Sequence, residues 1–417
     1  MFHPDPVFIY IILISVATTA IYLIYYFVNV YYLVKHRSPE ESGSGDEIGD
    51  VTILIPVYNE KINLFTRVID SAISQGVGVL VVGDSSYEPY KSITESRGAR
   101  FIHLEHRGGK RKAISDGIKF VGTKFVLFLD SDTVLPKDAV KTMLTHFKPN
   151  VGGVGANVTV SRSSSGASYS AEFMERAREI VLRAMSAHGG SVMVIDGKCA
   201  MYRTDLIKPL ILSKEFTDPR VAGRPAIMGD DQQMTSYIIR KGYKAEKSFE
   251  VVVETEPPEN FKQFTKQSIR WARSSYYYFF KNLFNGTALR AGGFYAFETV
   301  ATFVMPLLTL GLSLFRLYFE FRFIGHHADT FFDLIQNFIA LNLIGFHRFH
   351  RGGINFFHLL YFAGIPGPVL FGSALAFNLK RERLRTLGYG GIALLIIFAT
   401  SIYGMFTCWK QWSWLTR

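Results

Sequence analysis

The chain has 417 residues, of which 48% are hydrophobic and only 19% charged, and this charged share is below the roughly 25% of typical soluble domains. The formal net charge of +11 suits acidic partners such as nucleic acid, anionic lipid headgroups or anionic small molecules, and loops beside membrane helices carry Lys and Arg too. Two cysteines, Cys199 and Cys408, exclude a disulfide framework and a Cys-based zinc site.

The first apolar run, from Val7 to Val34, contains no charged residue. A helix needs about 20 residues to cross the hydrocarbon core of a bilayer, so the run predicts a membrane-spanning helix. It is too long for a signal-peptide core, and we expect a retained anchor over residues 1–36. Lys35, His36 and Arg37 follow, and the positive-inside rule predicts that the domain after them is cytoplasmic.

Residues 37–50 are expected to form a linker, because they are rich in Gly, Ser and acidic residues and cannot bury a core. From residue 51 to 258, short apolar runs of buried-strand type alternate with helical patterns. Helices are expected at Ile62 to Gln75, Lys110 to Val121 and Pro136 to Phe147. This alternation predicts a largely parallel sheet with helices on both faces, and such sheets bind ligands at the carboxyl ends of their strands.

The composition changes after residue 258. Residues 259–290 combine basic and aromatic side chains, which predicts amphipathic helices at the membrane surface. Residues 291–417 are expected to form a helical transmembrane region. Its apolar stretches lie near 293–318, 329–346, 354–378 and 388–408.

Two details of this region bear on its topology. The third stretch contains I-P-G-P, which breaks or kinks a helix. Four spans place the basic cluster Lys380 to Arg385 outside, against the positive-inside rule. A re-entrant or interfacial segment removes that conflict, so the number of spans stays open.

Polar side chains follow the first two expected strands. Tyr58 and Glu60 lie in I-P-V-Y-N-E, where an aromatic ring can stack on a base, although a tyrosine at a strand end more often packs. Asp84 ends V-V-G-D, where a carboxylate can accept hydrogen bonds from a base or a ribose, or merely form a turn. Lys110 lies in H-R-G-G-K-R-K at an expected helix start, which suits a diphosphate or a solvated basic turn.

An aspartate pair follows the next apolar strand, in F-L-D-S-D-T. Asp130 and Asp132 are two residues apart, and on an extended chain such residues face the same side. Two adjacent carboxylates repel each other unless a cation lies between them. Hard oxygen ligands suit Mg²⁺ or Mn²⁺, which could bridge a diphosphate.

Two later motifs also carry polar chemistry. In M-G-D-D-Q-Q, Asp230 or Asp231 is either the N-cap of the following helix or a general base that removes a proton from an acceptor hydroxyl. In Q-S-I-R-W, Gln267, Arg270 and Trp271 share one helix face. Arg can bind a pyrophosphate and Trp can support a sugar ring, whereas the simpler interpretation is a helix lying among lipid headgroups.

Taken in order, the six motifs resemble the family 2 glycosyltransferases with a GT-A fold, specifically the processive, membrane-integrated polysaccharide synthases of the hyaluronan, chitin and cellulose type. The resemblance covers about Val51 to Tyr278 and rests on V-Y-N-E, V-V-G-D, G-G-K-R, D-S-D, G-D-D and Q-S-I-R-W. It implies an α/β GT-A catalytic domain over residues 51–258 joined to an α-helical transmembrane region. It also implies a hexosyltransferase that uses a UDP-sugar.

The resemblance implies a role for each matched residue. The implied donor site consists of Tyr58, Glu60, Asp84, Lys110, Asp130, Gln267 and Arg270. Asp132, together with Asp130, is the implied ligand of Mn²⁺ or Mg²⁺. Asp231 is the implied base, with Asp230 beside it. The implied acceptor contacts are Trp271, Asp196 and Gly197.

Four features depart from the hyaluronan type. Gln232 replaces a basic residue after G-D-D, and Ser268-Ile269 replaces a second Gln before R-W. Asp196 and Lys198 add charge to the acceptor loop. One membrane segment, rather than two, precedes the catalytic domain. These departures leave the sugar and the polymer open.

The expected function is therefore an inverting, processive glycosyltransferase of the plasma membrane, multi-pass, with its catalytic domain in the cytoplasm. Its expected partners are the UDP-sugar, the growing polysaccharide and the lipid bilayer, and not nucleic acid; the oligomeric state stays open. The first alternative is an enzyme that moves one sugar onto a polyprenyl (dolichyl) phosphate or another lipid, which has no need of Q-S-I-R-W. A non-enzymatic scaffold or sugar sensor would leave both Asp pairs and the Gln/Arg/Trp set without a role.

Overall fold

The computed structural model describes residues 6–37, 48–161, 164–325, 333, 366–377, 379 and 384–412. The chain divides into two compact units, and each is described by itself. One unit comprises Met1–Val34 and Val300–Lys380, and the other comprises Lys35–Thr299 and Arg381–Arg417. The second unit contains the sheet and every residue expected to take part in catalysis.

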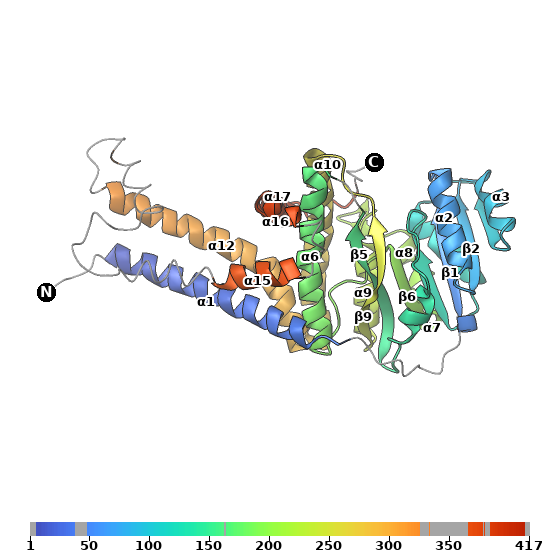
Figure 1. Cartoon of the computed structure of the whole chain (residues 1–417), viewed down its shortest axis with the longest axis horizontal. Helices are drawn as coiled ribbons and strands as arrows, with labels where there is room; N and C mark the ends of the chain where they lie inside the picture. Colours follow the sequence, from blue (N-terminus) through green and yellow to red (C-terminus); the bar gives the residue numbers. More distant parts are fainter. Residues whose placement is uncertain are drawn as a thin grey trace. The chain divides into compact units, whose positions relative to one another are not determined.

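A seven-stranded sheet organises this second unit, in the order β3-β2-β1-β4-β6-β5-β9 (Figure 1). The strands are β1 (Val51–Val57), β2 (Gly78–Asp84), β3 (Arg100–Leu104), β4 (Phe125–Leu129), β5 (Val151–Val160), β6 (Cys199–Arg203) and β9 (Lys244–Thr255). All pairs are parallel except those of β6, which runs antiparallel to β4 and β5. The prediction of a largely parallel α/β sheet is confirmed. A separate hairpin joins β7 (Arg220–Val221) to β8 (Arg224–Pro225).

The helices of this unit fall close to the expected places. They are α2 (Ile62–Ile73), α3 (Tyr90–Glu95), α4 (Lys110–Gly117), α5 (Ala139–Leu144), α6 (Gly166–Ala187), α7 (Thr204–Ile211), α8 (Lys214–Thr217), α9 (Asp230–Arg240), α10 (Phe261–Phe284), α11 (Thr287–Arg290), α16 (Arg385–Gly388) and α17 (Gly390–Met405). Short 3-10 turns occupy Ile48–Asp50 and Ile118–Phe120. The second turn explains why α4 ends before the expected Val121.

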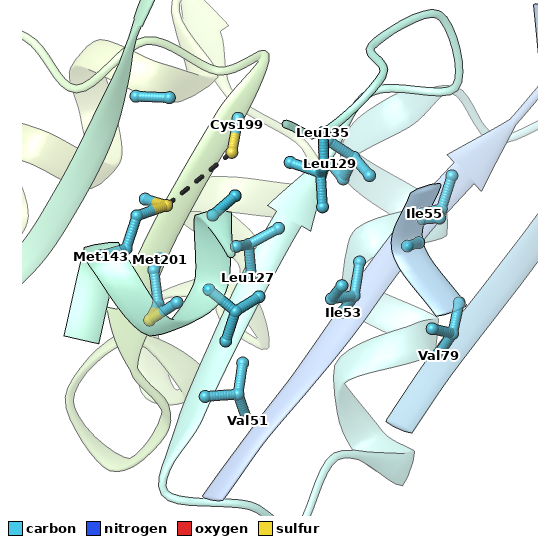
Figure 2. Packing of buried hydrophobic residues seen from close by; sticks show 14 of the residues in the cluster. Val51, Ile53, Ile55, Val79, Leu127, Leu129, Leu135, Met143, Cys199 and Met201 are labelled. Atoms are coloured by element: carbon cyan, nitrogen blue, oxygen red, sulfur yellow. Dashed lines mark hydrogen bonds between the residues drawn. The ribbon is translucent and has the colours of Figure 1, made fainter. Parts of the chain in front are cut away.

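The main core lies on one face of the sheet. Alternate residues of β1 (Val51, Ile53 and Ile55) point to this face, because successive side chains of a strand alternate between faces. Figure 2 shows them beside Val79 of β2 and residues of β4. Helices α2 and α5 contribute buried side chains to the same cluster, among them Phe65, Val68, Ile69, Ala72, Val140 and Met143.

Helix α4 covers the opposite face, where it approaches β1 and β2 closely. A Cβ atom placed on Gly117 would lie 2.8 Å from Leu54 Cδ1 and 2.7 Å from Val82 Cγ2. Glycine is therefore required for α4 to lie flat on the sheet. With helices on both faces, the carboxyl ends of β1, β2 and β4 are held at one edge.

The β5–β9 side of the sheet packs against long helices. Helix α6 contacts β5 and β9 (Figure 1), and α17 contacts both α6 and α10. Gly404 of α17 lies against Ala272 of α10, and the hydroxyl groups of Tyr276 and Ser401 are 3.0 Å apart. Residues 388–408 were expected within the C-terminal transmembrane region. In the structure α17 belongs to the unit of the sheet, where small residues allow it to approach α10, and its place in a membrane stays a prediction.

The other unit contains α1 (Pro6–Lys35), α15 (Pro366–Phe377) and the part of α12 (Gly293–Gly325) that follows Thr299. α15 begins within I-P-G-P, where the sequence predicted a helix break. Within the described parts of the chain, no helix combines the length and apolar character needed to cross a membrane. Most of the linker at 37–50, nearly all of 329–346 and 354–365, and Lys380 to Arg383 lie outside the described residues.

Gly117→Val should destabilise the protein by about 1–3 kcal/mol, because a larger side chain forces α4 away from Leu54 and Val82. Thermal unfolding of the purified protein measures this loss. The matched control is Gly122→Val, because no heavy atom lies within 4 Å of a Cβ at Gly122. Equal melting temperatures for the two variants would contradict this account of the packing.

Candidate active site

The expected site residues gather at the carboxyl edge of the sheet, around the ammonium group of Lys110. Its Nζ lies 2.5 Å from Asp130 Oδ1, 3.7 Å from Asp230 Oδ2 and 3.3 Å from the carbonyl oxygen of Gly197. Burial alone would lower the pKa of Lys110, but Asp130 and Asp230 raise it above its ordinary value. Lys110 therefore carries a fixed positive charge between three motifs that are far apart in the sequence.

Asp84 fixes the glycine loop that precedes Lys110. Its Oδ1 accepts a hydrogen bond from Gly108 N at 2.7 Å, and its Oδ2 accepts one from Gly109 N at 2.9 Å. Asp84 is buried, and Gly109 has a φ of 82°, which favours glycine. Both oxygens that we expected to hold a base or a ribose are thus engaged by the loop. Contact between Asp84 and uridine stays a prediction.

Tyr58 and Glu60 lie at the end of β1, as expected. The guanidinium carbon of Arg107 lies 4.0 Å from the centre of the Tyr58 ring and covers one ring face. Glu60 accepts a hydrogen bond from the Ser131 hydroxyl at 3.2 Å, which ties this segment to D-S-D. A base that stacks on Tyr58 must use the other ring face or displace Arg107.

Asp130 and Asp132 do come after a buried strand, but each faces a different lysine. Lys198 Nζ lies 3.2 and 3.3 Å from the two carboxylate oxygens of Asp132. Burial raises the pKa of Asp132, but Lys198 more than offsets this and the pKa falls below its usual value. The repulsion that we expected a metal to relieve is therefore relieved by Lys110 and Lys198. This arrangement corrects the argument that the pair needs a cation from outside the chain.

The D-S-D segment still meets some of the requirements of a divalent-metal site. No cluster of three or more His, Cys, Asp or Glu side chains suited to a metal occurs among the described residues. The carboxylate of Asp132 is 35% exposed and offers hard oxygen atoms, the ligand type that Mg²⁺ and Mn²⁺ prefer. Asp132 can thus supply one protein ligand to a metal that also binds a diphosphate, provided that Lys198 moves.

Helix α9 presents the second aspartate pair. Its N-cap is Gly229, with a φ of 80°, and not Asp230 or Asp231, so the capping interpretation is wrong. A Cβ at Gly229 would collide with Ser274 and Tyr278 of α10, which explains why glycine is required there. The two aspartates are the first residues of the helix, where the dipole favours negative charge.

The two adjacent carboxylates of α9 differ in their ionisation. Burial alone would raise the pKa of Asp230, but Lys110, Arg111 and Arg270 lower it. Burial and the charge of Asp230 raise the pKa of Asp231 to about 6. Gly197 adjoins Asp231, since a Cβ at position 197 would lie 3.4 Å from the Cβ of Asp231. A carboxylate in such a position can accept a proton near neutral pH.

Asp196, which was expected to contact an acceptor, has both carboxylate oxygens engaged within the protein, and its contact with an acceptor stays a prediction. Its carboxylate accepts hydrogen bonds from Arg178 at 2.5 Å and Lys247 at 2.6 Å. Burial would raise the pKa of Asp196, but these two cations lower it to about 2. Asp196 is 9% exposed and anchors the loop that carries Gly197 and Lys198.

The sequence interpretation missed the partners that hold this loop and α9. Arg178 lies on α6 and Lys247 on β9, and charged residues in such elements normally face water. Arg111 is also buried, and it donates to Gln233 Oε1 at 2.6 Å and to the carbonyl oxygens of Phe216 and Met228. Only the sequence of α6 contained a sign of buried charges, because Glu172, Glu175 and Glu179, which are buried in the structure, recur at helical spacing.

Gln267, Arg270 and Trp271 lie on α10, each partly buried. The charge of Arg270 lowers the pKa of Asp230, so this helix reaches the site. Gln232 Nε2 donates to Ser275 Oγ at 2.9 Å, which joins the first turn of α9 to α10. Contacts of Gln267 and Trp271 with a donor or acceptor stay predictions.

The C-terminal segment also supports α9. The carbonyl oxygen of Gln411 accepts a hydrogen bond from Ile227 N at 2.9 Å, and its Nε2 donates to the carbonyl oxygen of Arg273 at 3.0 Å. The guanidinium carbon of Arg224 lies 4.5 Å from the centre of the Trp412 ring. Residues 411 and 412 therefore join the segment before Asp230 to α10.

Residues 52–211 match the family model described as Glycosyl transferase family 2. This segment includes Tyr58, Asp84, Lys110, both aspartates of D-S-D and the Asp196 loop. Over these residues the chain is therefore similar to the family 2 glycosyltransferases.

Three similar proteins are each described as an N-acetylglucosaminyltransferase. The one from Azorhizobium caulinodans is 29% identical over 54% of this chain and 59% of its own length. The one from Sinorhizobium fredii is 30% identical over 54% and 57%, and the one from Rhizobium meliloti is 29% identical over 63% and 63%. The chain thus spans about six-tenths of the length of these relatives. The family match and these relatives support a sugar-transferring enzyme.

One similar solved structure is the mannosyltransferase PcManGT from Pyrobaculum calidifontis in complex with GDP-Man and Mn²⁺. The likeness has a TM-score of 0.55 and 17% sequence identity, and it covers 95% of this chain and 99% of that one. It supports the GT-A fold.

The transfer rate should fall as the pH drops through about 6, because the carboxylate of Asp231 becomes protonated and can no longer accept a proton. An ordinary aspartate titrates near pH 4. Asp230→Asn removes the neighbouring negative charge, lowers the pKa of Asp231 and should move this acid limb to lower pH. The measurement is the normalised rate of nucleotide release between pH 4.5 and 8.

Asp205→Asn, an exposed change in the first turn of α7, is the control and should leave the limb in place. An unmoved limb in Asp230→Asn would show that another group sets the pH dependence.

Proposed function

We propose that the chain is an inverting, processive glycosyltransferase that transfers N-acetylglucosamine from its UDP-sugar to a growing polysaccharide. The observation that carries this proposal is the convergence of three motifs on Lys110, with Asp231 beside Gly197 at the same point. The names of the similar proteins from rhizobia support N-acetylglucosamine as the sugar.

In the proposed reaction, Asp231 accepts the proton of the acceptor hydroxyl. The acceptor oxygen then forms a bond to the anomeric carbon of the donor sugar, on the side opposite the diphosphate. The bond between that carbon and the diphosphate oxygen breaks, and UDP leaves with the electron pair. One displacement of this kind inverts the anomeric configuration.

The raised pKa of Asp231 suits its role, because a base works best when its pKa lies near the working pH. Its neighbour Asp230 cannot substitute for it, since Lys110 and Arg111 hold the Asp230 carboxylate ionised and poorly basic. Asp231 therefore accepts the proton, whereas Asp230 interacts electrostatically with Lys110 and Arg270.

Positive charge in the site stabilises the leaving diphosphate. Lys110 and Arg270 carry positive charge in the described site, and preorganised charges in a partly dry site stabilise a developing negative charge strongly. A divalent metal held by Asp132 and the diphosphate would supply further positive charge to the leaving group when bound. Tyr58 and Arg107 would hold the base.

Processive elongation and membrane location are parts of the same proposal. Helix α10 carries Gln267, Arg270 and Trp271 and packs on α9, so it can hold the acceptor end beside Asp231. The charge-free run Val7 to Val34, followed by Lys35 to Arg37, supports a plasma-membrane protein with a cytoplasmic catalytic domain. The polysaccharide would then be exported through the membrane part.

The test of the proposed function is nucleotide release by the detergent-purified full chain. The donors are UDP-N-acetylglucosamine, UDP-glucuronate, UDP-glucose and GDP-mannose, singly and in pairs, with product length read on a gel. We expect long polymer from UDP-N-acetylglucosamine alone. Polymer only from a pair would indicate an alternating, hyaluronan-like synthase, and a single sugar on lipid would replace the proposal by the lipid-linked transferase.

Asp231→Asn should reduce transfer by about 100-fold or more, because it removes the base while keeping the size of the side chain. UDP binding should stay near that of the unchanged protein, since the base contacts the acceptor rather than the nucleotide. Isothermal titration with UDP and the release assay measure the two effects. Asp218→Asn, which alters an exposed ion pair with Arg220, is the control and should retain both. Normal transfer by Asp231→Asn would exclude it as the base.

A further inference from the structure

We propose that Lys198 is an internal cation that competes with the divalent metal for Asp132 and so weakens metal binding by the enzyme. This inference rests on the proposed donor site. The lysine lies in the segment where the polysaccharide synthases have their acceptor loop, and the mechanism above gives it no role.

The contact has the form of a cation seated on a carboxylate. Lys198 Nζ is nearly equidistant from the two oxygens of Asp132, at 3.2 and 3.3 Å. Thr133 Oγ1 donates to Asp132 Oδ1 at 3.0 Å and fixes the carboxylate from another side. The lysine side chain is 23% exposed and that of Asp132 is 35% exposed. An ion from solvent can therefore reach the same oxygens.

The backbone beneath Lys198 is held on three sides, so its position follows from the fold. The carbonyl oxygen of Lys198 accepts a hydrogen bond from Asp130 N at 2.9 Å, and that of Gly197 accepts one from Lys110. Asp196 is held by the buried cations Arg178 and Lys247. With this backbone fixed, the ammonium group can leave Asp132 only by rotation of its own flexible side chain.

A divalent ion at Asp132 must displace this ammonium group or share the carboxylate with it. Like charges within about 4–6 Å of each other destabilise the charged state by a factor of about 10 or more. Lys110, on the neighbouring Asp130, is too firmly held to move, because it also contacts Asp230 and Gly197. Lys198 is therefore the cation that competes with the metal for Asp132. Once displaced, its charge lies beside the diphosphate and can bind a phosphate oxygen.

Two measurements on the detergent-purified full chain test this inference. The first is the affinity for Mn²⁺, followed by electron paramagnetic resonance with UDP present. Lys198→Met keeps the length of the stem and removes the charge, so it should tighten Mn²⁺ binding about tenfold, whereas Lys198→Arg should not. The second is the affinity for UDP in EDTA, which should weaken several-fold in Lys198→Met because a cation near the diphosphate is lost.

A second variant pair separates competition from a structural effect. In the Asp132→Asn background, Lys198→Met should leave Mn²⁺ affinity unchanged, since the contested carboxylate is gone. Lys119→Met removes an exposed lysine that pairs with Asp116 and is the charge control. Thermal unfolding confirms that each variant is folded, and Lys198→Gln replaces Lys198→Met if that variant does not fold.

The failures of the inference and of the proposed function are distinguishable. If the unchanged chain binds UDP but Lys198→Met binds Mn²⁺ no more tightly, Lys198 does not compete with the metal. The proposed donor site is then unaffected. A loss of acceptor use in Lys198→Met without any change in Mn²⁺ affinity would likewise overturn the inference, in favour of acceptor binding. If the unchanged chain binds no UDP at all, the proposed function itself falls.

Discussion

The ion pair between Lys110 and Asp130 joins the start of α4 to the end of β4, and the rest of the site depends on it. The same ammonium group contacts Asp230 on α9 and the carbonyl oxygen of Gly197. Asp84 orients the glycine loop so that α4 begins at this point. The charge of Lys110 thus brings together residues from four distant parts of the chain. Because Lys110 lies beside Asp230, it lowers the pKa of Asp230 below that of Asp231.

The buried charges next to the site hold a loop in position. Asp196, Arg178 and Lys247 form a buried cluster, and burying ions costs more than a single pair returns unless each is hydrogen-bonded. Here the pairing fixes a loop whose backbone carbonyls contact Lys110 and Asp130. The loop must hold its position because Gly197 adjoins Asp231 and has no side chain that could contact it.

The sequence predicted the elements and the strand-end residues well, because hydrophobic period and turn chemistry are local. Asp84 and Asp130 could be placed at the carboxyl ends of strands from the sequence pattern, whereas Lys110 and the Asp230–Asp231 pair joined them only through the family resemblance. Asp196 could not, since its partners lie 18 and 51 residues away and only tertiary packing brings them to it. The packing of the stretch 388–408 could not be predicted for another reason: a mainly apolar helix of this length suits lipid and a helix partner equally, and only the structure shows that Gly404 lies against Ala272.

The contacts of Gln411 and Trp412 have a consequence for when the enzyme becomes competent. These residues come long after Asp230 in the sequence, yet they join the segment that leads into Asp230 to α10. During synthesis the sheet, α4 and the D-S-D strand can fold before residues 411 and 412 leave the ribosome. The two aspartates of α9 receive their full support only after residue 412 has emerged and folded back. The position of these two aspartates would therefore be fixed late in folding.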